Sequence, residues 1–312
     1  MLPDIVYHYC NTDTFFKIVE NKTLRLSDIE KSNDFLEKNW SIHQCLSHIR
    51  NLIEVGKRWE TTAGYALADA VEKEFSKYNR MILACCFSKQ RDLLSQWRGY
   101  GDNGAGICLG VDAGNAFSKA YQRTRDFFSS KIDVLGDMKN LGYDIIRYDA
   151  DELCQIMEKL FDKYLEMVPQ TLTMEQAAEK LVRLIYPALP YFKSPAFREE
   201  LEYRFVYYPN LPAAPYIPEL FSEEEFQEKL MLQKNPVEVD QFILQPMNYR
   251  ERNRNLVSYR DICFNNLSHP FIRSITIGPR CPVDRETLKL FMELNGLHID
   301  INDIYYSEVS YR

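Results

Sequence analysis

Glu202 and Arg204 lie two residues apart in the stretch of residues 201–208, where they alternate with Leu201, Tyr203 and Phe205. Residues two apart share one face of a β-strand, so the pattern predicts a strand with both side chains on the same face. The pair can be a plain ion pair, which contributes about 1 kcal/mol or less. It can also be a carboxylate that its neighbour keeps ionised for chemistry in a cleft. The sequence leaves both interpretations open.

A second candidate for chemistry is the stretch from residue 86 to residue 112. It predicts a strand, a polar turn, a short helix over residues 93–100, a glycine-rich turn and a second strand. Asp92 is placed to cap the helix, and glycines follow its last turn.

Two aromatic side chains of this helix, Trp97 and Tyr100, are three residues apart and are therefore expected on one helical face. With a nearby hydroxyl, from Ser88 or Ser95, they would form a stacking platform for a flat ligand. The alternative is that both rings belong to the core, because aromatic pairs at helical spacing usually do.

The densest basic patch is residues 248–255, with Arg250, Arg252 and Arg254 at every second position. Guanidinium groups bind phosphate with two hydrogen bonds each, so the patch is a candidate phosphate site. A solvated loop is the other interpretation.

Several reaction classes lack their signatures. There is no phosphate-binding loop, no His-Glu-x-x-His and no Ser-His-Asp pattern. The nearest glycine-rich element, from Gly101 to Gly106, precedes a strand and so lies in the wrong context for a dinucleotide-binding fingerprint. No convincing acidic cluster for a nuclease metal is visible, and we expect no metal site.

The composition is that of an ordinary globular chain. Of 312 residues, 46% are hydrophobic and 27% charged, and the net charge of −7 argues against broad, non-specific binding of nucleic acid. The eight cysteines form no Cys-x-x-Cys pair, and the adjacent Cys85 and Cys86 lie in an apolar run, which fits a reducing cytoplasm. We expect neither a signal peptide nor a membrane span.

The candidate residues must be positioned by a mixed set of elements. His8 lies within a predicted strand over residues 5–9. A short helix follows, and then a strand over residues 23–27 with Arg25 and Ser27 on one face. Helical periodicity dominates residues 35–80 and 150–190. No linker-like composition interrupts the chain, so we expect a single α+β domain, residues 1–312, with helical elaborations in those two stretches.

The order of short motifs is itself informative. The motifs are the strand with His8, the strand ending at Ser27, the Asn33-Asp34 turn, Phe87-Ser88, Gln96-Trp97-x-x-Tyr100, Gly106-Ile-Cys-Leu-Gly110, Glu202-Tyr-Arg204, Ile277-Gly-Pro279 and the terminal Ser-x-x-x-Tyr-Arg. In this order they resemble the bacterial family catalogued as domain of unknown function 2971. The resemblance extends over nearly the whole chain, apart from the helical stretches.

The opening of the chain is similar to that of ADP-ribosyltransferase-like proteins, which grip NAD in a split, twisted, mostly antiparallel β core. The resemblance implies that His8 bonds the nicotinamide-side ribose and that Glu202 stabilises the oxocarbenium-like centre. It implies an aromatic residue, Trp97 or Tyr100, stacked on nicotinamide. Cys10 stands where a threonine is common in that superfamily. Further candidates for contacts with NAD are Ser27, Ser88, Arg25, Arg204, Arg252 and Arg254.

Two functions follow as hypotheses. The first is NAD-dependent ADP-ribosyl transfer or NAD hydrolysis, with an unknown protein or nucleic-acid acceptor, in a bacterial toxin or phage-defence effector. The second is a non-catalytic module that binds a nucleotide or a protein, with the helical stretch as the partner surface. Nicotinamide release would separate the two.

Overall fold

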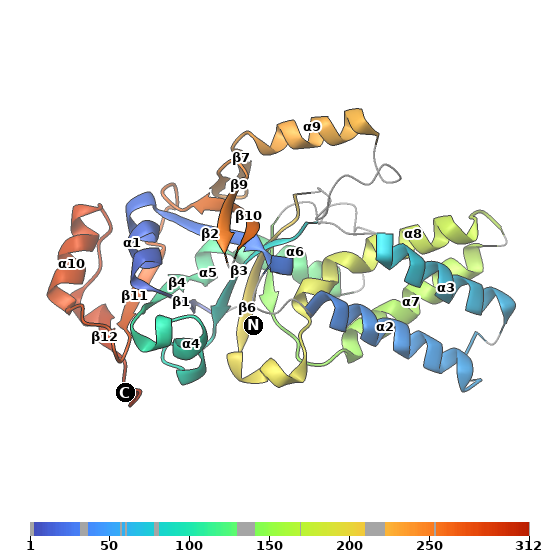
Figure 1. Cartoon of the computed structure of the whole chain (residues 1–312), viewed down its shortest axis with the longest axis horizontal. Helices are drawn as coiled ribbons and strands as arrows, with labels where there is room; N and C mark the ends of the chain where they lie inside the picture. Colours follow the sequence, from blue (N-terminus) through green and yellow to red (C-terminus); the bar gives the residue numbers. More distant parts are fainter. Residues whose placement is uncertain are drawn as a thin grey trace.

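Figure 1 shows the computed structural model of the chain, a twisted and mostly antiparallel β-sheet with helices around it. The predicted Asn33-Asp34 turn lies outside the described part of the chain. The structure describes residues 3–31, 37–56, 58–59, 61–77, 81–129, 141–168, 170–209, 222–252 and 254–311.

The sheet takes strands from both ends of the chain, in the order β12-β11-β4-β1-β3-β2-β10-β8-β7, with β6 beside β3, β5 beside β6 and β9 beside β10. All described pairings of these strands are antiparallel except that of β11 with β12. The strands are β1 (Ile5–Cys10), β2 (Thr23–Asp28), β3 (Leu83–Ser88), β4 (Ile107–Asp112), β5 (Leu141–Ile145), β6 (Glu202–Tyr207), β7 (Val237–Val239), β8 (Phe242–Leu244), β9 (Asn248–Arg252), β10 (Asn255–Cys263), β11 (Ile272–Ile277) and β12 (Ile304–Tyr306).

The helices lie around the sheet and in one separate group (Figure 1). They are α1 (Thr12–Asn21), α2 (Glu37–Glu54), α3 (Thr62–Lys77), α4 (Leu94–Gly99), α5 (Ala113–Ala116), α6 (Ser118–Phe128), α7 (Asp151–Met167), α8 (Met174–Ile185), α9 (Glu223–Gln233) and α10 (Arg285–Leu294). Among the described helices, none is both long and apolar enough to cross a membrane.

The sheet splits at β3. One edge of β3 pairs with β6 over its whole length. The other edge is shared: β1 pairs with it only at Ser88, and β2 pairs with it only at Leu83 and Ala84. Between these two contacts, the backbone of Cys85, Cys86 and Phe87 faces no described strand on that edge. The sheet therefore opens between β1 and β2, which are both antiparallel to β3.

The short β1–α1–β2 unit sets this opening. The side chain of Asn11 accepts a hydrogen bond from the backbone N–H of Thr14 and so caps α1 immediately after β1. Lys22 then adopts a left-handed conformation that ends the helix, with φ of 53°, and the chain enters β2 at Thr23. Since only one short helix joins the two strands, β1 and β2 stay close together on either side of the opening.

Two large hydrophobic clusters form most of the described interior, and a small third one contains Tyr9, Trp97 and Cys108. The larger cluster packs on one face of the sheet and takes alternate residues of β3, Leu83, Cys85 and Phe87. The second large cluster lies among α2, α3, α7 and α8 and contacts the other face of the sheet through Ala84 and Val206. The four helices come from the two stretches that the sequence predicted to be helical, and Figure 1 shows them packed side by side.

Candidate functional site

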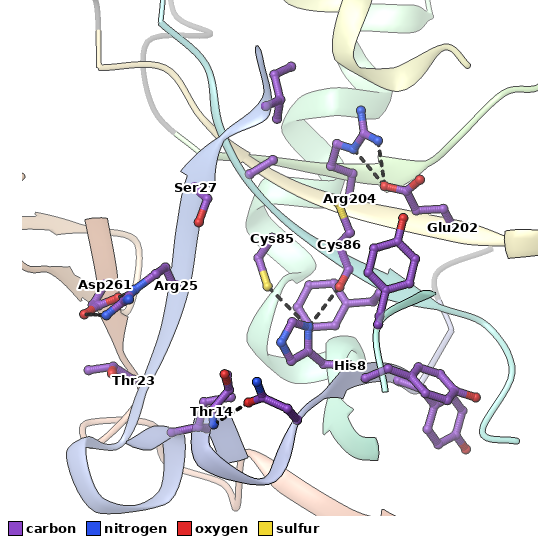
Figure 2. A pocket seen from close by; sticks show the side chains of 18 of the residues that line it. His8, Thr14, Thr23, Arg25, Ser27, Cys85, Cys86, Glu202, Arg204 and Asp261 are labelled. Atoms are coloured by element: carbon purple, nitrogen blue, oxygen red, sulfur yellow. Dashed lines mark hydrogen bonds and ion pairs between the residues drawn. The ribbon is translucent and has the colours of Figure 1, made fainter. Parts of the chain in front are cut away.

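A cavity of about 610 Å³ lies where the sheet splits. Its walls come from segments far apart in the chain: β1, α1, β2, β3, α4, β6, β9 and β10, with the loop before β6. Figure 2 shows the side chains that line it, with His8 on one side of the opening, Arg25 and Ser27 across from it on β2, and Glu202 with Arg204 at the β6 end.

His8 is held by the unpaired edge of β3. Its Nδ1 lies 3.0 Å from the Cys86 carbonyl oxygen and accordingly carries the proton and donates it. The hydrogen bond satisfies a carbonyl that has no strand partner, and it leaves Nε2 as the acceptor. Burial lowers the pKa of His8, although the bond to Cys86 opposes the shift. The ring is therefore neutral at pH 7, with a lone pair available for a hydroxyl in the cavity.

Glu202 begins β6 and is 5% exposed. Its Oε1 accepts two hydrogen bonds from Arg204, at 2.9 and 2.7 Å, and its Oε2 accepts one from the Lys193 ammonium at 3.2 Å. Burial by itself raises the pKa of this carboxyl, but the charges of Arg204 and Lys193 outweigh it and lower the pKa below its usual range. The Cys86 thiol is a further hydrogen-bond partner of this carboxylate.

Lys193 and Glu200 complete this end of the cavity, and neither was predicted from the sequence. The ammonium of Lys193, which is 3% exposed, also donates to Glu200 at 2.7 Å. The hydroxyl of Tyr100 lies 3.4 Å from Glu200. Glu200 is the last residue of a 3-10 helix, and Lys193 lies in the connection before that helix. Neither position follows the period of an α-helix or a strand, so the sequence pattern does not point to either residue. The proximity of Glu200 to Glu202 in the sequence was the one available signal.

Arg204 serves mainly to hold Glu202. It lines the cavity, but it is 2% exposed, and besides Glu202 it donates to the Pro190 carbonyl at 2.7 Å. Its predicted role as a contact for NAD therefore fits the geometry less well than a role in orienting the carboxylate.

The opposite wall is basic. Arg25 and Ser27 on β2 face the cavity together with Arg250 and Arg252 on β9. Arg250 donates to the Ser27 hydroxyl at 3.2 Å. Two of the three arginines of the predicted basic patch thus line the cavity, and Arg250 joins the candidate residues. Arg254 is exposed and is not among the lining residues.

Trp97 does not line the cavity, which corrects its prediction as a stacking residue. Its ring is fully buried against Tyr9, with centroids 4.8 Å apart, and its Nε1 donates to Asp92 at 2.6 Å. Asp92 therefore holds the indole and does not cap α4, whose N-cap is Leu93. Tyr100 is the aromatic residue of this pair that lines the cavity, with 41% of its surface exposed.

Ser88 is also outside the cavity. The residue is 1% exposed, and its hydroxyl donates to the Glu200 carbonyl at 2.9 Å and accepts from the backbone N–H of Gln90. It fixes the loop before β6, so its effect on the site is indirect. Of the predicted residues, the cavity thus unites His8, Ser27, Arg25, Tyr100, Glu202, Arg204 and Arg252.

A family model described as a protein of unknown function (DUF2971) matches residues 96–205. The matched segment supports the family resemblance that the motif order predicted. It begins in α4 and ends in β6, so it includes Tyr100 and Glu202 but not His8. No curated protein and no solved structure matches the chain. A functional proposal therefore rests on the cavity itself.

Proposed function

We propose that this chain cleaves the N-glycosidic bond of NAD and transfers the ADP-ribosyl group to a macromolecular acceptor or to water. One observation carries the proposal: a neutral histidine, His8, an ionised buried carboxylate, Glu202, and a wall of arginines line the same cavity. The split of the sheet supports the ADP-ribosyltransferase-like fold, because that superfamily is expected to grip NAD in such an opening.

The reaction needs charge stabilisation more than proton transfer. When the bond from the ribose C1′ to nicotinamide breaks, the electron pair leaves with nicotinamide and positive charge develops at C1′. A carboxylate at that position stabilises the transition state more than the ground state. The acceptor then supplies the electron pair of the new bond to C1′ and loses its proton. Glu202 is ionised for this role, and it lines the cavity in which the substrate would lie.

His8 and the arginine wall would position the substrate. The Nε2 atom of His8 accepts from a ribose hydroxyl, since Nδ1 is already engaged with Cys86. The guanidinium groups of Arg250 and Arg252 neutralise the pyrophosphate. Holding the ribose and the phosphates at the same time fixes the reacting centre against the carboxylate, which is how orientation contributes to catalysis. In the cell, the proposed activity fits a cytoplasmic toxin or phage-defence effector.

A specific observation favours a second candidate, a module that binds a nucleotide without turnover. Arg204 and Lys193 offset the negative charge of Glu202. A carboxylate neutralised by its neighbours stabilises a developing cation less than an unpaired one. The helical stretch would then be the surface for a partner protein.

Nicotinamide release separates the two functions. The purified chain is incubated with NAD, with and without cell extract as a source of acceptors, and nicotinamide is measured. Glu202→Gln should abolish release, whereas Glu199→Gln, the same change at a neighbouring exposed position, should leave it unchanged. Binding of NAD with no release under either condition would support the second candidate. Release that survives Glu202→Gln would remove Glu202 from the mechanism.

A further inference from the structure

Arg25 in the basic wall of the cavity is held by different contacts from those of the neighbouring arginines. On the face of β2 and β10 that the cavity exposes, Arg25 pairs in register with Asp261, and Ser27 pairs with Tyr259. Residues directly opposite each other in antiparallel strands lie on the same face. Arg25 is thus next to both Asp261 and Tyr259, and each of them contacts its guanidinium group.

Two contacts fix the guanidinium of Arg25. Its Nε and Nη2 donate to the two carboxylate oxygens of Asp261, at 2.8 and 3.0 Å. The group also lies over the ring of Tyr259, with Cζ 3.7 Å from the ring centroid. The carboxylate holds the edge of the guanidinium and the ring covers one of its sides. An arginine held in this way has lost most of the freedom that a flexible phosphate ligand would use.

The remaining side of Arg25 faces the cavity. Arg25 is one of the described lining residues of the cavity and Tyr259 is not, so the ring lies on the side of the guanidinium away from the cavity. The salt bridge to Asp261 offsets the positive charge, which makes Arg25 a weak partner for a phosphate. A planar cation with one open side is instead suited to stacking on an aromatic ring.

We infer that Arg25 is the platform of a nucleobase subsite. The base would lie in the cavity and stack on the open side of the Arg25 guanidinium, with the Tyr259 ring on the other side. The inference assigns the adenine end of the ligand in the proposed function and rests on it for the identity of that ligand. The same subsite would accept the base of any free mononucleotide of suitable size. The cavity and the net charge of −7 favour a small nucleotide over a nucleic-acid strand.

Arg250 provides the phosphate site beside this platform. Its Nη2 donates to Ser27, which follows Arg25 by two residues on the same face, roughly 6–7 Å along the strand. Its Nε is buried and has no hydrogen-bond partner within the described part of the chain. Burial and the charges of Arg25 and Arg252 lower the pKa of Arg250. An anion bound beside the guanidinium would offset this repulsion.

Binding of nucleotide fragments by the full chain tests the assignment. Calorimetry at one fixed salt concentration compares AMP, adenosine and ribose 5-phosphate. Arg25→Lys keeps the charge next to Asp261 but removes the planar group. It should weaken the binding of AMP and of adenosine about tenfold, which is in the lower part of the range for one base stack, and leave the binding of ribose 5-phosphate unchanged. Arg250→Ala should weaken the binding of AMP and of ribose 5-phosphate but not that of adenosine.

Controls keep the result clear of folding defects. Arg254→Lys, outside the cavity, should change none of the three affinities. Asp261→Asn, which loosens the hold on Arg25, should weaken the binding of AMP, as Arg25→Lys does. Equal loss of AMP and ribose 5-phosphate in Arg25→Lys would make Arg25 a phosphate ligand and overturn the inference. So would wild-type chain that binds no AMP, or that binds a short oligonucleotide far more tightly.

The outcome is separable from that of the proposed function, because AMP carries no nicotinamide. Binding of AMP that depends on Arg25, with no release of nicotinamide from NAD, would leave the subsite intact and remove the catalytic proposal. Release of nicotinamide with the same KM for NAD in wild type and in Arg25→Lys would do the reverse.

Discussion

Lys193 determines how much negative charge Glu202 presents to the cavity. Two carboxylates, Glu200 and Glu202, meet two cations, Lys193 and Arg204, so the group is neutral as a whole. A change that removes one charge leaves a buried partner uncompensated, which typically costs about 3–5 kcal/mol. A loss of activity in Glu202→Gln therefore has two possible causes, a missing catalytic group and a disturbed structure.

The double variant Glu202→Gln/Lys193→Gln separates these causes, because it returns the group to neutrality. We expect Glu202→Gln to lower the free energy of unfolding by about 3 kcal/mol and the double variant to recover part of that loss. Nicotinamide release should stay absent in both. Urea unfolding and nicotinamide assays on the same preparations provide the two readouts. Recovery of release together with stability would show that Glu202 acts only through the structure.

The lowered pKa of His8 predicts how its contribution to stability depends on pH. Its pKa is lowered in the folded chain, from an unfolded value of about 6.5. The unfolded chain then binds the proton more tightly, so the contribution of His8 to stability is present above about pH 6.5 and is lost as the pH falls through the folded pKa. We expect an NMR titration of the His8 ring to give a midpoint below 6.5. The spectrum of His8→Gln identifies the resonance, and a midpoint at or above 6.5 would mean that the ring is well hydrated.

At the scale of elements, the C-terminal segment acts as a brace for α4. Asp92 accepts from Trp97, from the Ser307 hydroxyl at 2.6 Å and from the backbone N–H of Glu308 at 2.7 Å. The segment after β12 is thereby fixed to the base of the helix that brings Tyr100 into the cavity.

Ser307→Ala should consequently loosen both partners. It removes one donor from the Asp92 carboxylate, so we expect the free energy of unfolding to fall by about 1–3 kcal/mol and proteolysis of the last residues to become faster. Ser310→Ala is the matched control, since Ser310 is exposed and only three residues away. Equal effects of the two changes would mean that the hydroxyl of Ser307 does not hold the segment.

The same elements show how far the sequence could predict the site. Period-two alternation placed Glu202 and Arg204 on one face of a strand, and Arg25 and Ser27 on another, because a strand allows only two directions. The predicted helical spacing of Trp97 and Tyr100 was less decisive, because α4 ends at Gly99 and Tyr100 is its C-cap, with a non-helical φ of −129°. The helix turns Trp97 inwards, whereas Tyr100 lies after the helix and lines the cavity. Lys193 follows no period, so only the tertiary structure could reveal it.

At the scale of the molecule, the helical cluster reaches the site through Phe192. This residue is fully buried in the cluster of α2, α3, α7 and α8, and its carbonyl lies 3.5 Å from the Ser41 hydroxyl of α2. The next residue is Lys193, whose backbone N–H donates to the Arg147 carbonyl at 3.0 Å. Packing among the helices thus sets the position of the ammonium that bridges Glu200 and Glu202.

Two core variants of equal severity test this link. Phe192→Ala and Leu181→Ala both remove fully buried side chains from the helical cluster, and each should lower the free energy of unfolding by about 2–5 kcal/mol. Only Phe192 adjoins Lys193, so only its variant should lower NAD turnover when both are assayed well below their unfolding temperatures. Because a cavity at position 192 lets the backbone of Lys193 shift, it weakens the hold on the carboxylate that faces the substrate. Equal turnover in the two variants, at matched stability, would show that the helical cluster supports the fold without positioning the site.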